Sequence, residues 1–67
     1  MDAITKLNEG TYSFQTKGVE YIVTLKRNDT RTIQIFDQTL IPVPMTDIEV
    51  WDKIESGMYD YIDSLVN

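Results

Sequence analysis

The sequence predicts an α+β domain in which a three-stranded antiparallel β-meander packs against one long C-terminal amphipathic helix. Apolar and polar residues alternate in three short runs between residues 11 and 37, which is typical of half-buried strands. Apolar residues then recur at helical spacing between residues 46 and 66. The chain has 67 residues, enough for one domain, so the predicted order is β-β-β-α with a short N-terminal helical turn as a further element.

Residues 1–10 allow two interpretations. Asp2 can cap a short helix that carries Ile4 and Leu7 and ends at Gly10. The same ten residues can instead form an irregular or strand-like arm. We expect a short helix or arm that precedes the three-stranded meander.

Residues 11–37 are expected to form the meander. The first run places Tyr12 and Phe14 on one face. Gly18 follows this run and permits the positive φ that a tight hairpin turn requires. Residues 19–26 have the strongest strand pattern of the chain, with the odd-numbered apolar positions on one face.

The third predicted strand follows a turn at residues 28–30, where Asn and Asp side chains favour local hydrogen bonds. In this strand Ile33 and Ile35 are expected to face the core. Polar residues occupy most alternate positions of all three strands, which predicts that the other sheet face is solvated. Ile22 and Phe36 are the apolar exceptions on that face.

Residues 38–45 are expected to form an extended connector, because Pro42 and Pro44 cannot belong to a central strand. A short edge strand at 39–41 fits this segment. The connector leads into the predicted helix, whose start has the form of a capping box. In this motif the Thr46 hydroxyl accepts a hydrogen bond from the Glu49 amide while the Glu49 carboxylate reaches back.

The helix is predicted to span residues 46–66. Its first stripe residue, Trp51, is expected to be the main side chain filling the core. Gly57 lies in mid-helix at a cost of about 1 kcal/mol relative to Ala, so we expect another backbone to approach it closely. The apolar stripe consists of Trp51, Ile54, Met58, Tyr61 and Leu65, widened by Ile48 and Ile62.

The formal net charge of −5 comes from 6 basic and 11 acidic residues and is concentrated in the helix. Residues 1–45 carry five charges of each sign, whereas residues 46–67 carry one basic and six acidic residues. At about 100° per residue, most of these acids fall on one side of the helix. This acidic side consists of Glu49, Asp52, Glu55, Tyr59, Asp60 and Asp63.

Two interpretations of the acidic side remain open. It can be a solvated helix face, or it can contact a basic partner. Asp60 and Asp63 favour contact, because they lie toward the C-terminal end of the helix, where the helix dipole disfavours acids. Only the pair of Glu49 with Lys53 has opposite charges at i,i+4 spacing, so the sequence leaves most of the repulsion uncompensated.

Composition argues against several classes of function. The chain has no Cys and no His, which removes thiol chemistry, zinc–thiolate sites and the commonest general base. Its glycines stand alone and form no phosphate-binding loop. We therefore expect no enzymatic activity, no cofactor and no metal. The net charge of −5 argues against direct binding to nucleic acid or to a membrane.

The first residues lack the basic and apolar regions of a signal peptide, so the expected location is the cytoplasm of a microbe or of an infected host cell. The size, acidity and lack of catalytic residues are similar to those of small phage-encoded inhibitors of restriction enzymes, CRISPR nucleases or uracil-DNA glycosylase. The likeness is one of class and rests on no shared motif. It implies a protein partner whose basic surface normally binds nucleic acid.

The sequence thus predicts a small acidic protein-binding module whose acidic side docks on a basic surface. The alternative is a structural or regulatory homodimer in which the acids serve solubility. Its expected interface consists of Ile22, Phe36, Val50, Gly57 and Tyr61. A small enzyme or metal-dependent factor is the third and least supported hypothesis.

Overall fold

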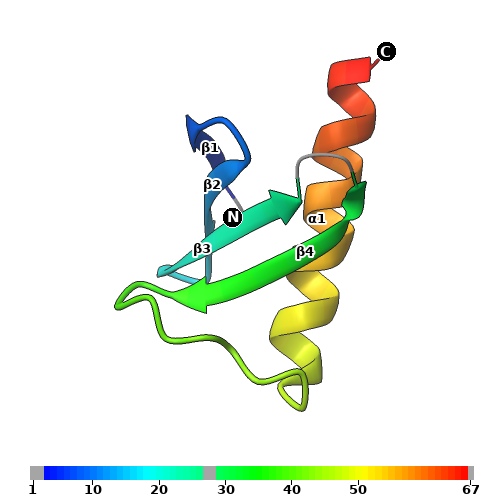
Figure 1. Ribbon diagram of the computed structural model, residues 1–67. Helices are drawn as coiled ribbons and strands as arrows, with labels where there is room; N and C mark the ends of the chain where they lie inside the picture. The colour runs from blue at the N-terminus through cyan, green and yellow to red at the C-terminus, as the bar shows by residue number, and fades with distance from the viewer. Residues whose placement is uncertain (1–2, 27–28, 67) are drawn as a thin grey trace.

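The computed structural model describes residues 3–26 and 29–66, with side chains for residues 3–25 and 33–65. An antiparallel meander of strand order β1-β2-β3-β4 is followed by one helix (Figure 1). The elements are β1 (Ala3–Asn8), β2 (Thr11–Thr16), β3 (Val19–Lys26), β4 (Asp29–Asp37) and α1 (Ile48–Val66). The predicted α+β class with one C-terminal helix is confirmed. The predicted number of three strands is wrong, because the described chain contains four.

The additional strand is β1, within the ten residues for which the sequence allowed either a short helical turn or an irregular or strand-like arm. It pairs antiparallel with β2, and Ile4 lies opposite Phe14 while Lys6 lies opposite Tyr12. Only one large apolar residue of β1 therefore faces the core, so the alternation that identifies a strand is missing. Pairing with β2 outweighs this weak local pattern.

Glycines at positive φ make the first two hairpin turns. Gly10, at φ 79°, lies between β1 and β2. Between β2 and β3, Lys17 at φ 53° and Gly18 at φ 77° have the two positive values that match the right-handed twist of a hairpin. The turn predicted at residues 28–30 lies partly outside the described residues, because Asn28 is not described and β4 begins at Asp29.

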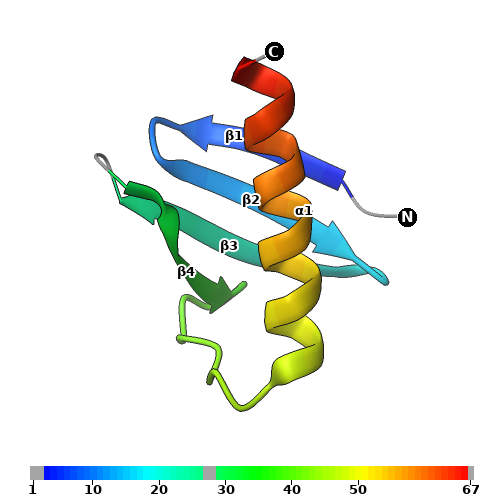
Figure 2. The same cartoon turned by 90° about the vertical axis from the view of Figure 1, so that its right-hand side faces the viewer.

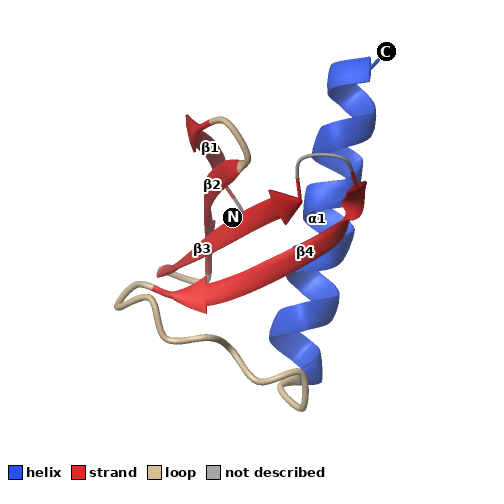
Figure 3. Cartoon of the chain, viewed as in Figure 1, coloured by secondary structure: helices blue, strands red, loops and turns tan. Residues whose placement is uncertain are grey.

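The core lies between one face of the sheet and α1. Figure 2 shows α1 crossing that face from the β4 edge toward β1 and beyond it. The strands and the helix appear as two separate layers in the colouring of Figure 3. The inward positions predicted for the meander are confirmed. The buried apolar residues are Tyr12, Phe14, Val23, Ile33 and Ile35 from the sheet and Ile54 and Met58 from α1.

The centre of the helix stripe differs from the prediction. Ile54 and Met58 are 0% exposed, whereas Trp51 is only half-buried and lies at the margin of the core. The Trp51 indole Nε1 donates a hydrogen bond to the Val43 carbonyl oxygen at 3.1 Å. The large indole therefore joins the helix to the connector, and Ile54 and Met58 fill the core.

Gly57 accommodates an aromatic ring rather than the backbone that the sequence predicted. A Cβ atom at this position would lie 2.7 Å from Phe14 Cε2 and 2.8 Å from Phe14 Cζ. The absence of a side chain at Gly57 thus creates the space in which the fully buried Phe14 ring packs against α1.

The helix begins two residues later than predicted, and the expected capping box is not formed. The first helical hydrogen bond runs from the Trp51 amide to the Asp47 carbonyl oxygen at 3.1 Å, so Asp47 occupies the N-cap position. The Asp47 amide in turn donates to the Pro44 carbonyl oxygen at 2.9 Å. The Glu49 carboxylate accepts from Lys17 Nζ at 3.3 Å instead of reaching back to Thr46.

The connector covers part of the outer edge of β4. The Asp37 amide donates to the Ile41 carbonyl oxygen and the Val43 amide to the Ile35 carbonyl oxygen, both at 2.9 Å. Phe36 and Pro42 form an antiparallel bridge between these bonds. A short edge segment therefore exists, two residues later than the predicted position at 39–41.

Candidate functional site

The acidic side lies along an uninterrupted helix of 19 residues. Asp52, Asp60 and Asp63 are exposed. No salt bridge joins any of the three to a basic side chain in the part of the chain that the structure describes. Asp52 and Asp63 are eleven positions apart, which corresponds to about 17 Å along the axis at ~1.5 Å per residue. These three carboxylates are the exposed members of the acidic side that have no ion pair within the described residues.

The other members of the acidic side have different environments. Glu49 is exposed but forms an ion pair with Lys17 at 3.3 Å. An exposed pair of this kind contributes only about 0–1 kcal/mol, and the Glu49 carboxylate stays accessible. Glu55 and Tyr59 are half-buried, and Tyr59 packs against the core. The acidic side therefore consists of four exposed carboxylates and, nearer the core, the two half-buried side chains of Glu55 and Tyr59.

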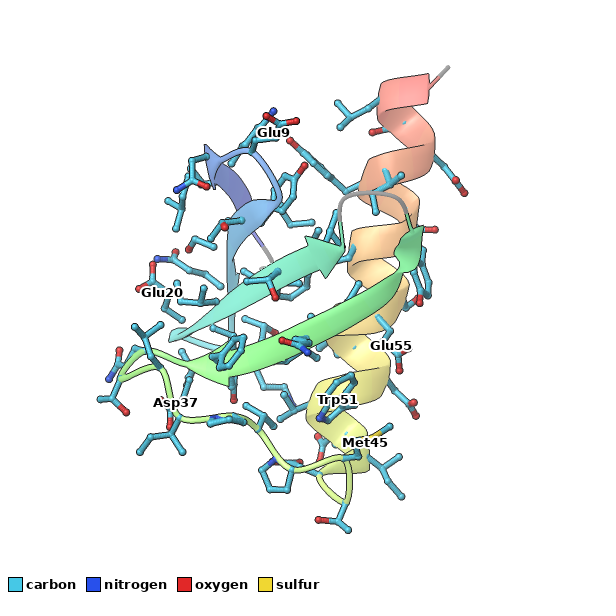
Figure 4. All side chains as sticks on the ribbon, in the orientation of Figure 1. Glu9, Glu20, Asp37, Met45, Trp51 and Glu55 are labelled. Carbon is cyan, nitrogen blue, oxygen red and sulfur yellow. The ribbon has the colours of Figure 1, made fainter. Side chains whose placement is uncertain are left out.

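Glu55 also lines an open groove of about 570 Å³ at the β4 edge. The groove lies between β4, the connector and the first two turns of α1. Figure 4 shows Trp51, Met45 and Glu55 close together on this side of the molecule. The lining residues are Ile33, Gln34, Ile35, Phe36, Pro42, Val43, Met45, Trp51 and Glu55.

This groove was not predicted from the sequence, although its signal was present in the connector. Residues 40–45 contain four large apolar residues among their six positions. Met45 is 75% exposed in the structure, which leaves a thioether at the rim of the groove. A solvated connector does not need so many apolar side chains, so their number could have indicated a surface feature there.

The residues of the predicted dimer interface do not lie together. Ile22 and Phe36 are cross-strand partners on the sheet face that α1 leaves uncovered. Val50 and Tyr61 pack from α1 against the core. Gly57 faces Phe14 in the interior. The five positions thus belong to opposite faces of the sheet.

A second and smaller cavity of about 210 Å³ lies beside the start of α1. Lys17, Glu49 and Lys53 contribute charged groups to its lining. Thr16 also lines it and is buried, and its Oγ1 has no hydrogen-bond partner. The oxygen is enclosed by protein atoms, so it is not accessible to a molecule in the cavity.

The charged groups of the described chain do not form a metal site. Among these residues, no three acidic side chains gather as metal ligands. Asp37 is a carboxylate with a shifted pKa, and its role is local. A hydrogen bond from the Thr39 hydroxyl, followed by one from the Ile41 amide, lowers the pKa of Asp37 below its usual value of 3.8. This carboxylate orders the turn after β4.

No protein-family model matches the chain, and no curated protein and no solved structure matches it either. Within residues 3–26 and 29–66, no helix is both long and apolar enough to cross a membrane. Function is therefore inferred from the surfaces of this chain alone. Two features stand out on them, namely the row of exposed aspartates on α1 and the apolar groove beside it.

Proposed function

We propose that this chain is a small, non-enzymatic protein-binding module whose acidic side docks on a basic surface of another protein. The observation that carries the proposal is the exposure of Asp52, Asp60 and Asp63 along one side of a continuous helix, without a described basic partner. Aligned carboxylates create a negative potential that attracts a positively charged surface and accelerates the encounter.

The finer proposal is that the partner's surface normally binds nucleic acid, as for a phage-type inhibitor acting in the cytoplasm of a microbe or of an infected cell. Six acidic residues between Asp47 and Asp63 span about 24 Å, or one charge per ~4 Å. Duplex DNA carries one charge per ~1.7 Å. One copy of the chain therefore reproduces only part of the charge density of DNA.

Affinity capture with two matched variants tests this function. The first variant combines Asp52→Asn, Asp60→Asn and Asp63→Asn. The control combines Thr5→Lys, Gln15→Lys and Gln38→Lys, which are exposed positions outside α1. Each variant changes the formal net charge from −5 to −2 (−5 + 3). We expect the control to retain a basic partner that the asparagine variant loses. Equal capture by both variants would remove the acidic side from the mechanism.

The alternative function is a homodimer, and one observation favours it. Ile22 and Phe36 pair directly across two strands on the sheet face that α1 does not cover. Apolar cross-strand pairs on such a face can join two copies. Sedimentation should then show a dimer that Ile22→Lys converts to a monomer. A monomer at every concentration would eliminate this alternative and leave the first proposal intact.

A further inference from the structure

We propose that the groove at the β4 edge receives an extended segment of the partner, with alternating apolar and basic residues, as an additional strand of the sheet. The proposal rests on the proposed function and names the part of the partner that the module holds. It follows from the open backbone edge of β4, the apolar lining of the groove and the charge beside it.

The hydrogen bonds of β4 show where the edge is open. The outward bonds at Asp37 and Ile35 mean that alternate residues of β4 direct their amide and carbonyl groups away from β3, so Ile33 does so as well. The Ile33 backbone has no hydrogen bond on that side to any part of the chain that is described. An unpaired edge of this kind is a template for another strand.

The connector does not continue the pairing. In the register of the Phe36–Pro42 bridge, the next hydrogen bonds to β4 would involve the Val43 carbonyl oxygen and the Met45 amide. The Val43 carbonyl oxygen accepts the Trp51 indole hydrogen bond at 3.1 Å rather than one from β4. The connector therefore leaves the edge at Val43 and turns toward α1. The groove is the space that it leaves beside Ile33.

The groove has the size and surface that an extended segment needs. Its volume of about 570 Å³ is within the range of ligand sites, about 300–1,000 Å³. Trp51 is half-buried on one wall, and the largely exposed Met45 stands at the rim. Tryptophan and methionine are both enriched at protein interfaces, where they supply large contact areas. An apolar side chain of the added strand would lie against them.

The negative charge at the groove favours a segment that carries basic residues. Glu55 lines the groove, and the exposed Asp52 stands beside it on α1. A Lys or Arg in the added strand, next to its apolar anchor, would meet these carboxylates. A second copy of this chain is a poorer occupant, since each copy carries a net charge of −5 and like charges repel.

The test uses random nine-residue peptides displayed on a surface and selected on the complete protein. The tightest selected peptide is then synthesised and titrated. The chain has one tryptophan, so fluorescence reports on the groove through Trp51 alone. We expect selected peptides to alternate apolar residues with Lys or Arg. On binding they should change Trp51 fluorescence and protect the Ile33 amide from hydrogen exchange. N-methylation of the peptide amides that face β4 should abolish binding.

Two matched pairs of variants distinguish the groove from the rest of the surface. Glu55→Lys should weaken the selected peptide by about tenfold, whereas Asp63→Lys, with the same charge change farther along α1, should leave it within about twofold. Met45→Glu should likewise weaken binding, and Ile41→Glu should not, because Ile41 is exposed outside the groove.

Several results would overturn the proposal. They are the absence of any selected peptide, selection of peptides without basic residues, or binding that leaves Trp51 and Ile33 unchanged. If the Ile33 amide is protected by self-association in the absence of peptide, a second copy of the chain pairs with the β4 edge. That result would also reject the proposal. Binding that depends on Asp63 rather than Glu55 would reject the groove while leaving the acidic docking side in place.

Discussion

At the scale of single residues, Phe14 and Gly57 determine how closely α1 approaches the sheet. The Phe14 ring occupies the space where a Gly57 side chain would stand, at 2.7 Å from the position of its Cβ. Glycine in mid-helix costs about 1 kcal/mol in helix propensity. In the structure this glycine lies at the point where the buried Phe14 ring packs against the helix.

Gly57→Ala should therefore destabilise the protein despite the gain in helix propensity. Overpacking costs about 1–3 kcal/mol, and the propensity gain offsets about 1 kcal/mol of it. Urea unfolding measures the change. Ser56→Ala, at the exposed neighbouring position, is the control and should be neutral or slightly stabilising. In a Phe14→Leu background the cost of Gly57→Ala should shrink, and an unchanged cost would contradict the contact.

Asp37 orders the turn after β4 by accepting three hydrogen bonds on one oxygen. The donors to Asp37 Oδ1 are the Thr39 hydroxyl at 2.7 Å, the Thr39 amide at 2.8 Å and the Ile41 amide at 3.0 Å. The hydrogen bond from the Thr39 hydroxyl contributes most to lowering the pKa of Asp37 below 3.8. The ionised form of this carboxylate thus stabilises the folded state more than its protonated form does.

This lowered pKa predicts a pH dependence of known sign. The stabilisation by Asp37 is fully present above 3.8, the usual pKa of the group, and is lost as the pH falls through the lower folded-state pKa. Asp37→Ala should therefore lower the free energy of unfolding more at pH 7 than at a pH well below 3.8. Gln38→Ala is the control without an ionisable group. An Asp37→Ala effect that is equal at both pH values would contradict the assignment.

At the scale of elements, β1 is held more weakly than the strands beside it. Five of its six residues are exposed, and only Ile4 is half-buried against the core. β2, in contrast, has four buried residues. An element with few buried apolar contacts opens at a lower free energy than the rest of the fold.

The difference can be measured with truncations on the two edge strands. Ile35→Ala in β4 removes a side chain that is 2% exposed and should cost about 2–5 kcal/mol. Ile4→Ala should cost clearly less, since Ile4 is already half in water. Native-state hydrogen exchange should also show β1 amides exchanging before those of β2 and β3. Equal costs, or equal protection, would show that β1 is part of the central core.

The predictability of each element depended on how many of its side chains are buried. The inward alternation of Tyr12 and Phe14, and the helical spacing of Ile54 and Met58, identified β2 and α1. β1 carries one inward apolar residue, so its pairing with β2 is a tertiary effect that no local pattern reports. The start of α1 was misplaced because the cap depends on Asp47 backbone bonds rather than on the Thr46 side chain.

At the scale of the whole molecule, charge and apolar surface occupy adjoining parts of one side. Exposure of Asp52, Asp60 and Asp63 could be predicted from helical periodicity, since each lies away from the apolar stripe. The groove could not be predicted in the same way. It depends on the path of the connector along β4 and on the half-buried position of Trp51, which require three separate segments to be placed together.

The salt dependence of binding tests the central claim most directly. For a partner recovered by affinity capture, the dissociation constant of the unmodified chain should rise steeply with salt concentration, because screening weakens contacts between exposed charges. The variant with Asp52→Asn, Asp60→Asn and Asp63→Asn should bind more weakly and with a shallower dependence, while the lysine control keeps the steep one. An asparagine variant that binds with the same affinity and the same salt dependence would show that the acidic side is only a solvated face.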